Sequence, residues 1–228
     1  MPARIERPVL SVDVVLFRIT EDNNELAALL HRRASRPFAG AWALPGVAVR
    51  IDETLEAAAK RALEEKGQLA AAALHLEQLA TFDAVYRDPR GRTISVAHIG
   101  LVPLSAAGPR GDVAAWRPLS SIERGGLPFD HGWILETAVT RLRGKLRYTN
   151  IAARLLPETF RIDELQAVYE AVLGRRLNRA NFRNKLLKIG LIERAGVLSE
   201  AVGKRGGRPP HLYRFTEEEV GAQDRDFV

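Results

Sequence analysis

Charged side chains recur at helical spacing in residues 44–69, LPGVAVRIDETLEAAAKRALEEKGQL, and carboxylates in such patterns can bind divalent metal ions. Thr54 occupies an N-cap position, and the helix that follows has an apolar stripe, Leu55, Ala58, Ala59, Ala62 and Leu63. Residues 62, 65 and 66 share one face because they are three and four residues apart. Ala62, Glu65 and Lys66 sum to zero charge there, so we predict neither a metal site nor metal-activated catalysis.

This stretch resembles the Nudix box, a loop–helix motif usually written G-x5-E-x7-R-E-U-x-E-E-x-G-U, where U is bulky and apolar. Five positions match without gaps: Glu53, Arg61, Leu63, Glu65 and Leu69. Four positions depart from the motif: Val47, Ala62, Lys66 and Gln68. In a working Nudix enzyme the helix carboxylates hold a divalent metal against a diphosphate. The resemblance therefore implies a Nudix fold that has lost its chemistry but kept a ligand pocket.

The length and composition of the chain exclude several classes of protein. A chain of 228 residues is long enough for two modest domains, and the absence of cysteine excludes disulfides and thiolate metal sites. No apolar run approaches the length of a membrane span, and MPARIERPVL lacks the apolar core of a signal peptide. We therefore expect a cytoplasmic protein with no membrane partner.

The net charge of +6 is distributed unevenly along the chain. Residues 1–144 carry 18 basic and 17 acidic side chains, and residues 145–216 carry 15 basic and 6 acidic ones, a net of +9. The tail, 217–228, carries one arginine and five acids. A neutral part followed by a strongly basic part predicts that the second part binds a polyanion, although a solvated basic surface is the simpler alternative.

Apolar segments bounded by turn residues predict strands at residues 9–17, 26–31, 76–82 and 94–102, with a short strand or corner at 116–119. A helix over 132–143 closes this part. His98 lies on an apolar strand and is interpreted as a packed core residue. These elements fit the α/β/α sandwich of the Nudix family, and we assign residues 1–144 to it.

The second part, residues 145–228, has the order of a winged helix-turn-helix domain followed by an acidic tail. Helices are predicted at 148–156, 161–173 and 178–189, the last ending before Gly190. Two strands, at 191–193 and 211–215, flank a long loop with Lys204, Arg205 and Arg208. The predicted fold class is therefore α+β, a Nudix sandwich followed by a winged domain.

The third helix of this part has a basic, amide-rich face that suits a DNA major groove. We predict contacts at or near bases from Arg179, Asn181, Arg183 and Asn184, and phosphate contacts from Lys185, Lys188, Lys204 and Arg205. Arg208 follows two glycines and is the candidate for the minor groove.

A Nudix domain fused to a basic winged helix resembles the NrtR family, Nudix-related transcriptional regulators of NAD metabolism. Besides the box, the resemblance rests on RDPRGRTISVAH, LPFDHGWIL, KLRYTNIAARLLP, LQAVYEAVLGRRLNRANFRNKLL and GRPPHLYRF. It implies a homodimeric repressor on a palindromic operator near NAD biosynthesis or salvage genes. It also implies that ADP-ribose, or a related NAD-derived nucleotide, binds the Nudix domain and releases the DNA, with no cofactor required.

The candidate contacts to this effector cluster around the box. Three arginines just ahead of it can reach a diphosphate, an aromatic ring can stack on adenine, and residues of the box can add charge. The candidates are Arg32, Arg33, Arg36, Phe38, Trp42, Arg50, Glu53, Glu65 and Lys66.

Two other functions stay open on the sequence. The first is a Nudix hydrolase, an ADP-ribose pyrophosphatase with an accessory winged domain, which needs Glu53, Glu64 and Glu65 to bind enough metal. The second is a nucleic-acid or protein adaptor in which the Nudix fold is vestigial. Turnover of ADP-ribose would identify the first, and DNA binding that ignores nucleotides would favour the second.

Overall fold

The computed structural model describes residues 7–22, 24–71, 74–103, 108–109, 111–197, 210–217 and 221. Contacts divide the chain into two compact units. The first comprises Met1–Phe17, Ala27–Val102 and Ala106–Val139, and the second comprises Arg18–Leu26, Pro103–Ser105 and Thr140–Val228. The division falls inside one continuous helix, α2 (His131–Tyr148), which also runs across residue 144. The domain boundary expected there stays a prediction.

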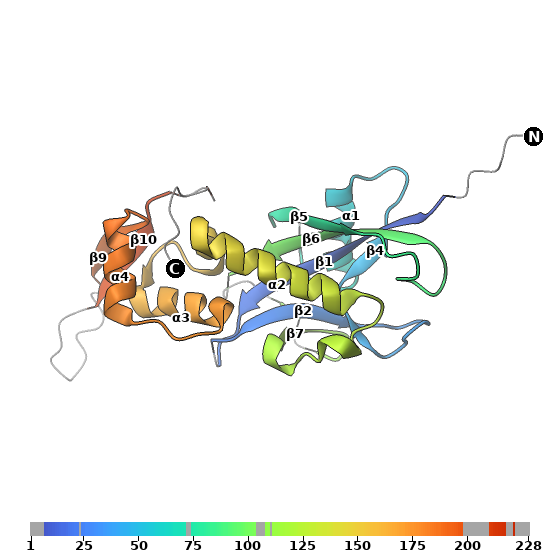
Figure 1. Cartoon of the computed structure of the whole chain (residues 1–228), viewed down its shortest axis with the longest axis horizontal. Coiled ribbons are helices and arrows are strands. Elements are labelled where there is room, and N and C mark those ends of the chain that lie inside the picture. Colours follow the sequence, from blue (N-terminus) through green and yellow to red (C-terminus); the bar gives the residue numbers. More distant parts are fainter. Residues whose placement is uncertain are drawn as a thin grey trace, which may run out of the picture. The chain divides into compact units, whose positions relative to one another are not determined.

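A seven-stranded mixed sheet forms the first unit (Figure 1). Its main path runs β3-β2-β1-β6-β5, with β4 paired to β1 and β7 paired to β2. The central strand β1 runs parallel to β6, whereas β5 is antiparallel to β6. The strands are β1 (Val9–Ile19), β2 (Leu26–Arg32), β3 (Trp42–Ala43), β4 (Gly46–Ala48), β5 (Leu76–Phe82), β6 (Thr93–Leu101) and β7 (Ala114–Pro118).

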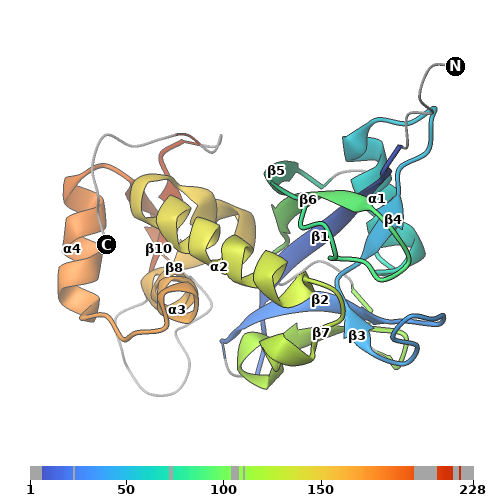
Figure 2. The same ribbon diagram turned by 45° about the vertical axis from the view of Figure 1, so that its right-hand side comes forward.

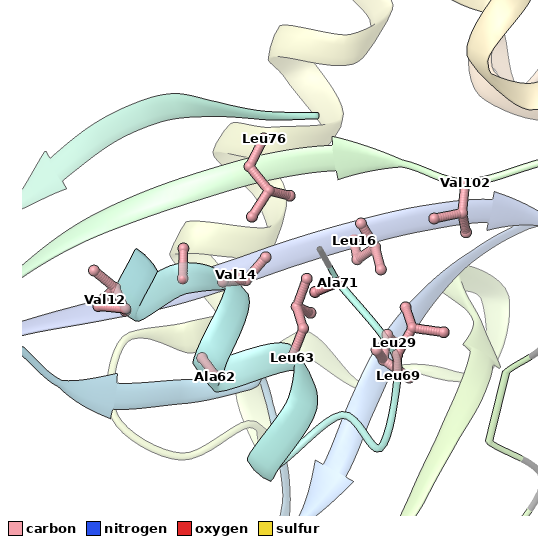
Figure 3. Close-up of a cluster of buried hydrophobic side chains, with 12 residues drawn as sticks. Val12, Val14, Leu16, Leu29, Ala62, Leu63, Leu69, Ala71, Leu76 and Val102 are labelled. Atoms are coloured by element: carbon pink, nitrogen blue, oxygen red, sulfur yellow. The ribbon is translucent and has the colours of Figure 1, made fainter. Parts of the chain in front are cut away.

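The helix of the box, α1 (Leu55–Glu65), covers one face of this sheet. It begins where expected, because the Thr54 hydroxyl accepts a hydrogen bond from the amide of Ala57. Its small apolar side chains allow close approach to the strands, and Figure 3 shows Ala62 and Leu63 among strand residues. The buried cluster comprises Val12, Val14, Leu16, Leu29, Ala58, Ala59, Ala62, Leu63, Leu69, Ala71, Leu76 and Val102.

The opposite face of the sheet receives the beginning of α2. Asp13 lies between Val12 and Val14, so its side chain points away from α1. There its carboxylate lies 3.4 Å from the Nε2 atom of His131, in the first turn of α2. Trp133 packs edge-on against Phe82 of β5. The helix–sheet–helix layering confirms the predicted α/β/α sandwich.

The second unit contains the winged helix-turn-helix fold that the sequence predicted (Figure 2). Helices α3 (Ile162–Leu173) and α4 (Arg179–Lys188) pack together, with Phe182 edge-on to Tyr169 at 5.0 Å. A three-stranded antiparallel sheet follows the order β8-β10-β9. Its strands are β8 (Phe160–Arg161), β9 (Ile192–Val197) and β10 (His211–Phe215).

Several elements differ from the sequence prediction. The closing helix of the first part is longer than residues 132–143, because Gly144 lies within α2. The short helix expected at 148–156 is a 3-10 helix, η3 (Ile151–Leu155), and it begins later than expected because Tyr148 still belongs to α2. Short 3-10 helices, η1 (Leu119–Ser121) and η2 (Arg124–Gly126), follow β7.

Candidate functional site

The carboxylates of the box are engaged by arginines. Both oxygens of Glu53 accept hydrogen bonds from Arg61, at 3.0 Å from Nε and 2.6 Å from Nη2. The Arg61 Nη1 atom donates to Glu65 at 3.2 Å, and Arg50 lies 3.5 Å from the same carboxylate. The hydrogen bond from Arg61 lowers the pKa of Glu53 to about 2. This network ties the loop before α1 to the helix and neutralises both acids.

Metal binding finds little support in this arrangement. Ala62 is fully buried in the apolar cluster, Glu64 and Glu65 are exposed, and Lys66 is half-buried. Within the described ranges, no three His, Cys, Asp or Glu side chains come together as a metal site would require. A hard cation needs several oxygen ligands, and Glu53 and Glu65 already share Arg61.

The predicted effector contacts fall into separate groups. Arg50, Glu53 and Glu65 belong to the network around Arg61. Arg32 donates from Nε to the Gly40 carbonyl, and Arg36 is exposed. The ring of Trp42 has the Arg117 guanidinium 5.2 Å from its centroid.

Lys66 acts on a buried histidine of β2. Burial lowers the pKa of His31 to about 4, and the charge of Lys66 adds to this effect. His31 is only 8% exposed, so it has little access to solvent that would stabilise a proton on its ring. The box lysine therefore contributes positive potential next to β2 instead of a metal ligand.

A buried polar cluster lies beneath the start of α2, and sequence reasoning did not single it out. Arg87 donates two hydrogen bonds to Asp130, at 2.8 and 2.6 Å, and one to Asp13 at 3.2 Å. Ser95 donates to Asp13 at 2.6 Å, and the Leu44 amide donates to Nδ1 of His131. His131 therefore carries its proton on Nε2, which faces Asp13.

The electrostatics of this cluster favour an ionised Asp13. Burial alone raises the pKa of Asp13, but His131, Ser95 and Arg87 outweigh it and lower that pKa to about 2. The cluster joins strands β1 and β6 to the segment before α2, so it fixes the position of residues 129–131. Its members come from segments far apart in the chain, around residues 13, 44, 87, 95 and 130, so spacing alone gave no signal.

Phe129 forms the centre of a second cluster. Its backbone has φ 57°, a left-handed conformation that residues other than glycine rarely adopt. Phe38 packs edge-on against its ring at 5.0 Å, and His131 is 5.3 Å away. The guanidinium groups of Arg33 and Arg90 lie over the same ring. Of the residues predicted to bind the effector, this cluster brings together Arg33 and Phe38.

Helix α4 presents the predicted DNA contacts to solvent. Phe182 and Leu186 are buried, whereas all six candidates on this helix are exposed: Arg179, Asn181, Arg183, Asn184, Lys185 and Lys188. Helical spacing places Asn181, Asn184 and Lys188 opposite the buried side. The Asn178 side chain caps the helix by accepting from the Asn181 amide. Lys204, Arg205 and Arg208 lie outside the described residues.

Comparison with known proteins covers both units. Residues 152–215 match the NrtR DNA-binding winged helix domain, and residues 9–136 match the NUDIX domain. In the described part of the chain, every helix is too short or too polar to cross a membrane.

The relatives found include both regulators and an enzyme. The ADPR responsive transcriptional repressor NtrR of Acinetobacter baylyi is 35% identical over 96% of this chain and 85% of its own length. The crystal structure of Shewanella oneidensis NrtR is 32% identical, with a TM-score of 0.75 over 96% of this chain and 99% of that one. The same protein was solved with a 27mer DNA (29% identical, TM-score 0.74, 96% and 99% covered). Its NUDIX domain was solved with ADP ribose (33% identical, TM-score 0.54, 62% and 93% covered). An ADP-ribose pyrophosphatase of Methanocaldococcus jannaschii is 36% identical over 40% of this chain and half of its own length.

Proposed function

Because this chain belongs to the NrtR family of Nudix-related transcriptional regulators, we propose that it is a DNA-binding repressor controlled by an NAD-derived nucleotide. Its winged helix domain binds an operator, and its Nudix domain binds ADP-ribose or a related nucleotide that releases the DNA. The observation that carries this proposal is the presence of both domains in one chain, with similarity to a nucleotide-responsive repressor along nearly its whole length. The family resemblance extends the proposal to genes of NAD biosynthesis or salvage.

The Nudix domain binds its ligand without hydrolysing it in this proposal. Ala62 and Lys66 replace two carboxylates of the box, and the remaining Glu53 and Glu65 are neutralised by Arg61 and Arg50. Metal is what activates water and neutralises the leaving phosphate in this chemistry. Positive charge from arginine and lysine substitutes for the metal in holding a diphosphate, so binding needs no cofactor.

The winged domain recognises DNA through α4 and through Lys204, Arg205 and Arg208, which lie outside the described residues. The exposed amides and guanidinium groups of α4 contact base edges, while the lysines near its end contact phosphates. Because one such helix covers only a few base pairs, the protein acts as a homodimer on a palindromic operator.

A gel-shift assay on the DNA upstream of the protein's own gene tests this function. We expect a specific complex that ADP-ribose dissociates, whereas a scrambled duplex binds weakly at the same salt concentration. If no NAD-derived nucleotide changes the protein–DNA complex, the protein binds DNA but is not controlled by such an effector. The adaptor function would then be favoured.

An ADP-ribose pyrophosphatase is the second candidate function, because the archaeal relative bears that name and Glu53, Glu64 and Glu65 are present. We expect no turnover approaching an ordinary enzyme rate, on the order of 10 per second, with Mg²⁺ or Mn²⁺. Steady-state hydrolysis at that rate would make this chain an enzyme.

A further inference from the structure

Two arginines from distant parts of the chain lie over one aromatic ring in the first unit. The guanidinium carbons of Arg33 and Arg90 are 4.8 and 5.6 Å from the centroid of Phe129. Both distances are those of cation–π contacts, which orient a guanidinium plane without occupying its N–H donors. The ring that supports them has an unfavourable left-handed backbone, and such strain often accompanies a functional position.

Both guanidinium groups are anchored and still have N–H donors to offer. Arg33 donates from Nε to the Pro37 carbonyl at 2.9 Å, and Arg90 donates from Nε and Nη2 to the two oxygens of Asp88. Within the described residues, neither terminal nitrogen of Arg33 nor the Nη1 atom of Arg90 has a hydrogen-bond partner. The Arg90 side chain is 60% exposed, so a ligand from solvent can reach it.

Nearby carboxylates balance the charges of the two arginines only in part. Asp88 pairs with Arg90, but no carboxylate in the described chain forms an ion pair with Arg33. Burial, and next the charge of Arg90, lowers the pKa of Arg33. Two neighbouring cations with unused N–H donors suit an anion that carries two charges and several acceptor oxygens. A diphosphate has this chemistry.

An aromatic surface lies directly beside these cations. Phe38 contacts Phe129 edge-on and keeps 44% of its own surface exposed. The ring of Trp42, the other aromatic candidate, has the Arg117 guanidinium over one of its faces. A nucleotide diphosphate at the arginines would therefore have Phe38 within reach for stacking of its base.

We infer that Arg33, Arg90 and Phe129 form the diphosphate subsite of the effector, with Phe38 as the neighbouring platform for the adenine. The inference rests on the proposed function and adds Arg90 and Phe129 to the residues expected from the sequence. Arg33 and Arg90 clamp the two phosphates, and Phe129 keeps both guanidinium planes in place.

Calorimetric titration of the full chain with ADP-ribose tests the subsite. Arg33→Gln, Arg90→Gln and Phe129→Leu should each weaken binding about 10- to 100-fold, because each disturbs a charge-assisted contact to phosphate. Arg124→Gln is the matched control, since it removes the same charge from an exposed pair with Glu136 and should leave the affinity unchanged. Adenosine, which has no phosphate, should bind the wild type and the arginine variants equally.

Removing Arg90 leaves the buried Asp88 without its partner, so a thermal melt must accompany each variant. Arg90→Lys keeps a charge for Asp88 but loses the planar fork, and should still bind ADP-ribose more weakly. Unchanged ADP-ribose affinity in folded Arg33→Gln and Phe129→Leu would overturn the subsite and leave the proposed function standing. A wild-type protein that binds neither ADP-ribose nor a related NAD-derived nucleotide would overturn both.

Discussion

His31 connects a departure from the Nudix box to the acid stability of the fold. Its folded pKa of about 4 lies below the ordinary value of 6.5, through burial and then the charge of Lys66. Between these values the unfolded chain binds a proton that the folded chain does not. Stability is therefore complete above about pH 6.5 and falls as the pH drops toward 4, by up to about 3 kcal/mol. Urea unfolding at several pH values should reveal this loss.

The variant His31→Gln isolates the effect. It cannot titrate, so it should lose much less stability than the wild type between pH 6.5 and 4. Lys66→Gln should raise the pKa of His31 toward its ordinary value, as measured by an NMR titration of the imidazole. If the free energy of unfolding falls with pH equally in His31→Gln and in the wild type, another group causes the loss of stability in acid.

Residue types and their spacing predicted which residues of the Nudix box lie together, but they did not predict the residues that surround the box in space. Their spacing in the sequence identified Glu53, Arg61 and Glu65 as positions of the Nudix box. The structure brings these three side chains together. Phe129 and Arg90 gave no comparable signal, because they meet Arg33 only after β2, β6 and α2 are assembled. Contacts between residues about 40 to 100 positions apart depend on tertiary packing, which periodicity does not encode.

Replacing a glycine by alanine should have opposite effects on stability at two helix positions, Gly144 and Gly174. Gly144 lies inside α2, and an added Cβ there meets no described atom within 4 Å. Gly144→Ala should therefore stabilise the protein by about 0.5–1 kcal/mol. Gly174 ends α3 with φ 68°, so Gly174→Ala should cost about 1–2 kcal/mol. Denaturant unfolding of the two variants measures both values, and destabilisation by Gly144→Ala would contradict the continuous helix.

Helix α4 should separate sequence recognition from general attraction to DNA. Asn181→Ala or Arg183→Ala should cost about 1–3 kcal/mol on the operator and little on a scrambled duplex. Lys188→Ala should weaken both duplexes alike and make the salt dependence shallower by about one unit. Binding titrations on both duplexes at several salt concentrations make the comparison. Equal losses on both duplexes for Asn181→Ala would mean that this face of α4 does not recognise bases.

Strands were predictable from sequence where a segment several residues long is rich in apolar and aromatic side chains. Residues 76–82 and 211–215 form the strands expected there, and His98 is buried as expected. Strands β3 and β4 escaped prediction because two- and three-residue segments have no period and form only by pairing with β2 and β1. The short helix expected over 148–156 differs in its start and its type, because α2 continues to Tyr148 and the residues after it form the 3-10 helix Ile151–Leu155.

The whole molecule should assemble on DNA as a homodimer. A single α4 covers a few base pairs, so two protomers should bind half-sites about one helical turn apart, roughly 34–36 Å. Light scattering of the protein–operator complex should give two chains per duplex. An insertion of about half a turn between the half-sites, 5 base pairs, should abolish the complex. A mass of one chain per operator would contradict the homodimer.

ADP-ribose and operator DNA should each weaken the binding of the other by the same factor. If ADP-ribose weakens operator binding by some factor, operator DNA must weaken ADP-ribose binding by the same factor, because both describe one coupling free energy. Couplings of this kind are typically about 5- to 150-fold. Calorimetric titration of ADP-ribose into the free protein and into the operator complex, at one salt concentration, measures the factor directly. A scrambled duplex, which leaves the protein free at that concentration, should have no effect. Equal ADP-ribose affinity for free and operator-bound protein would mean that the nucleotide does not control DNA release.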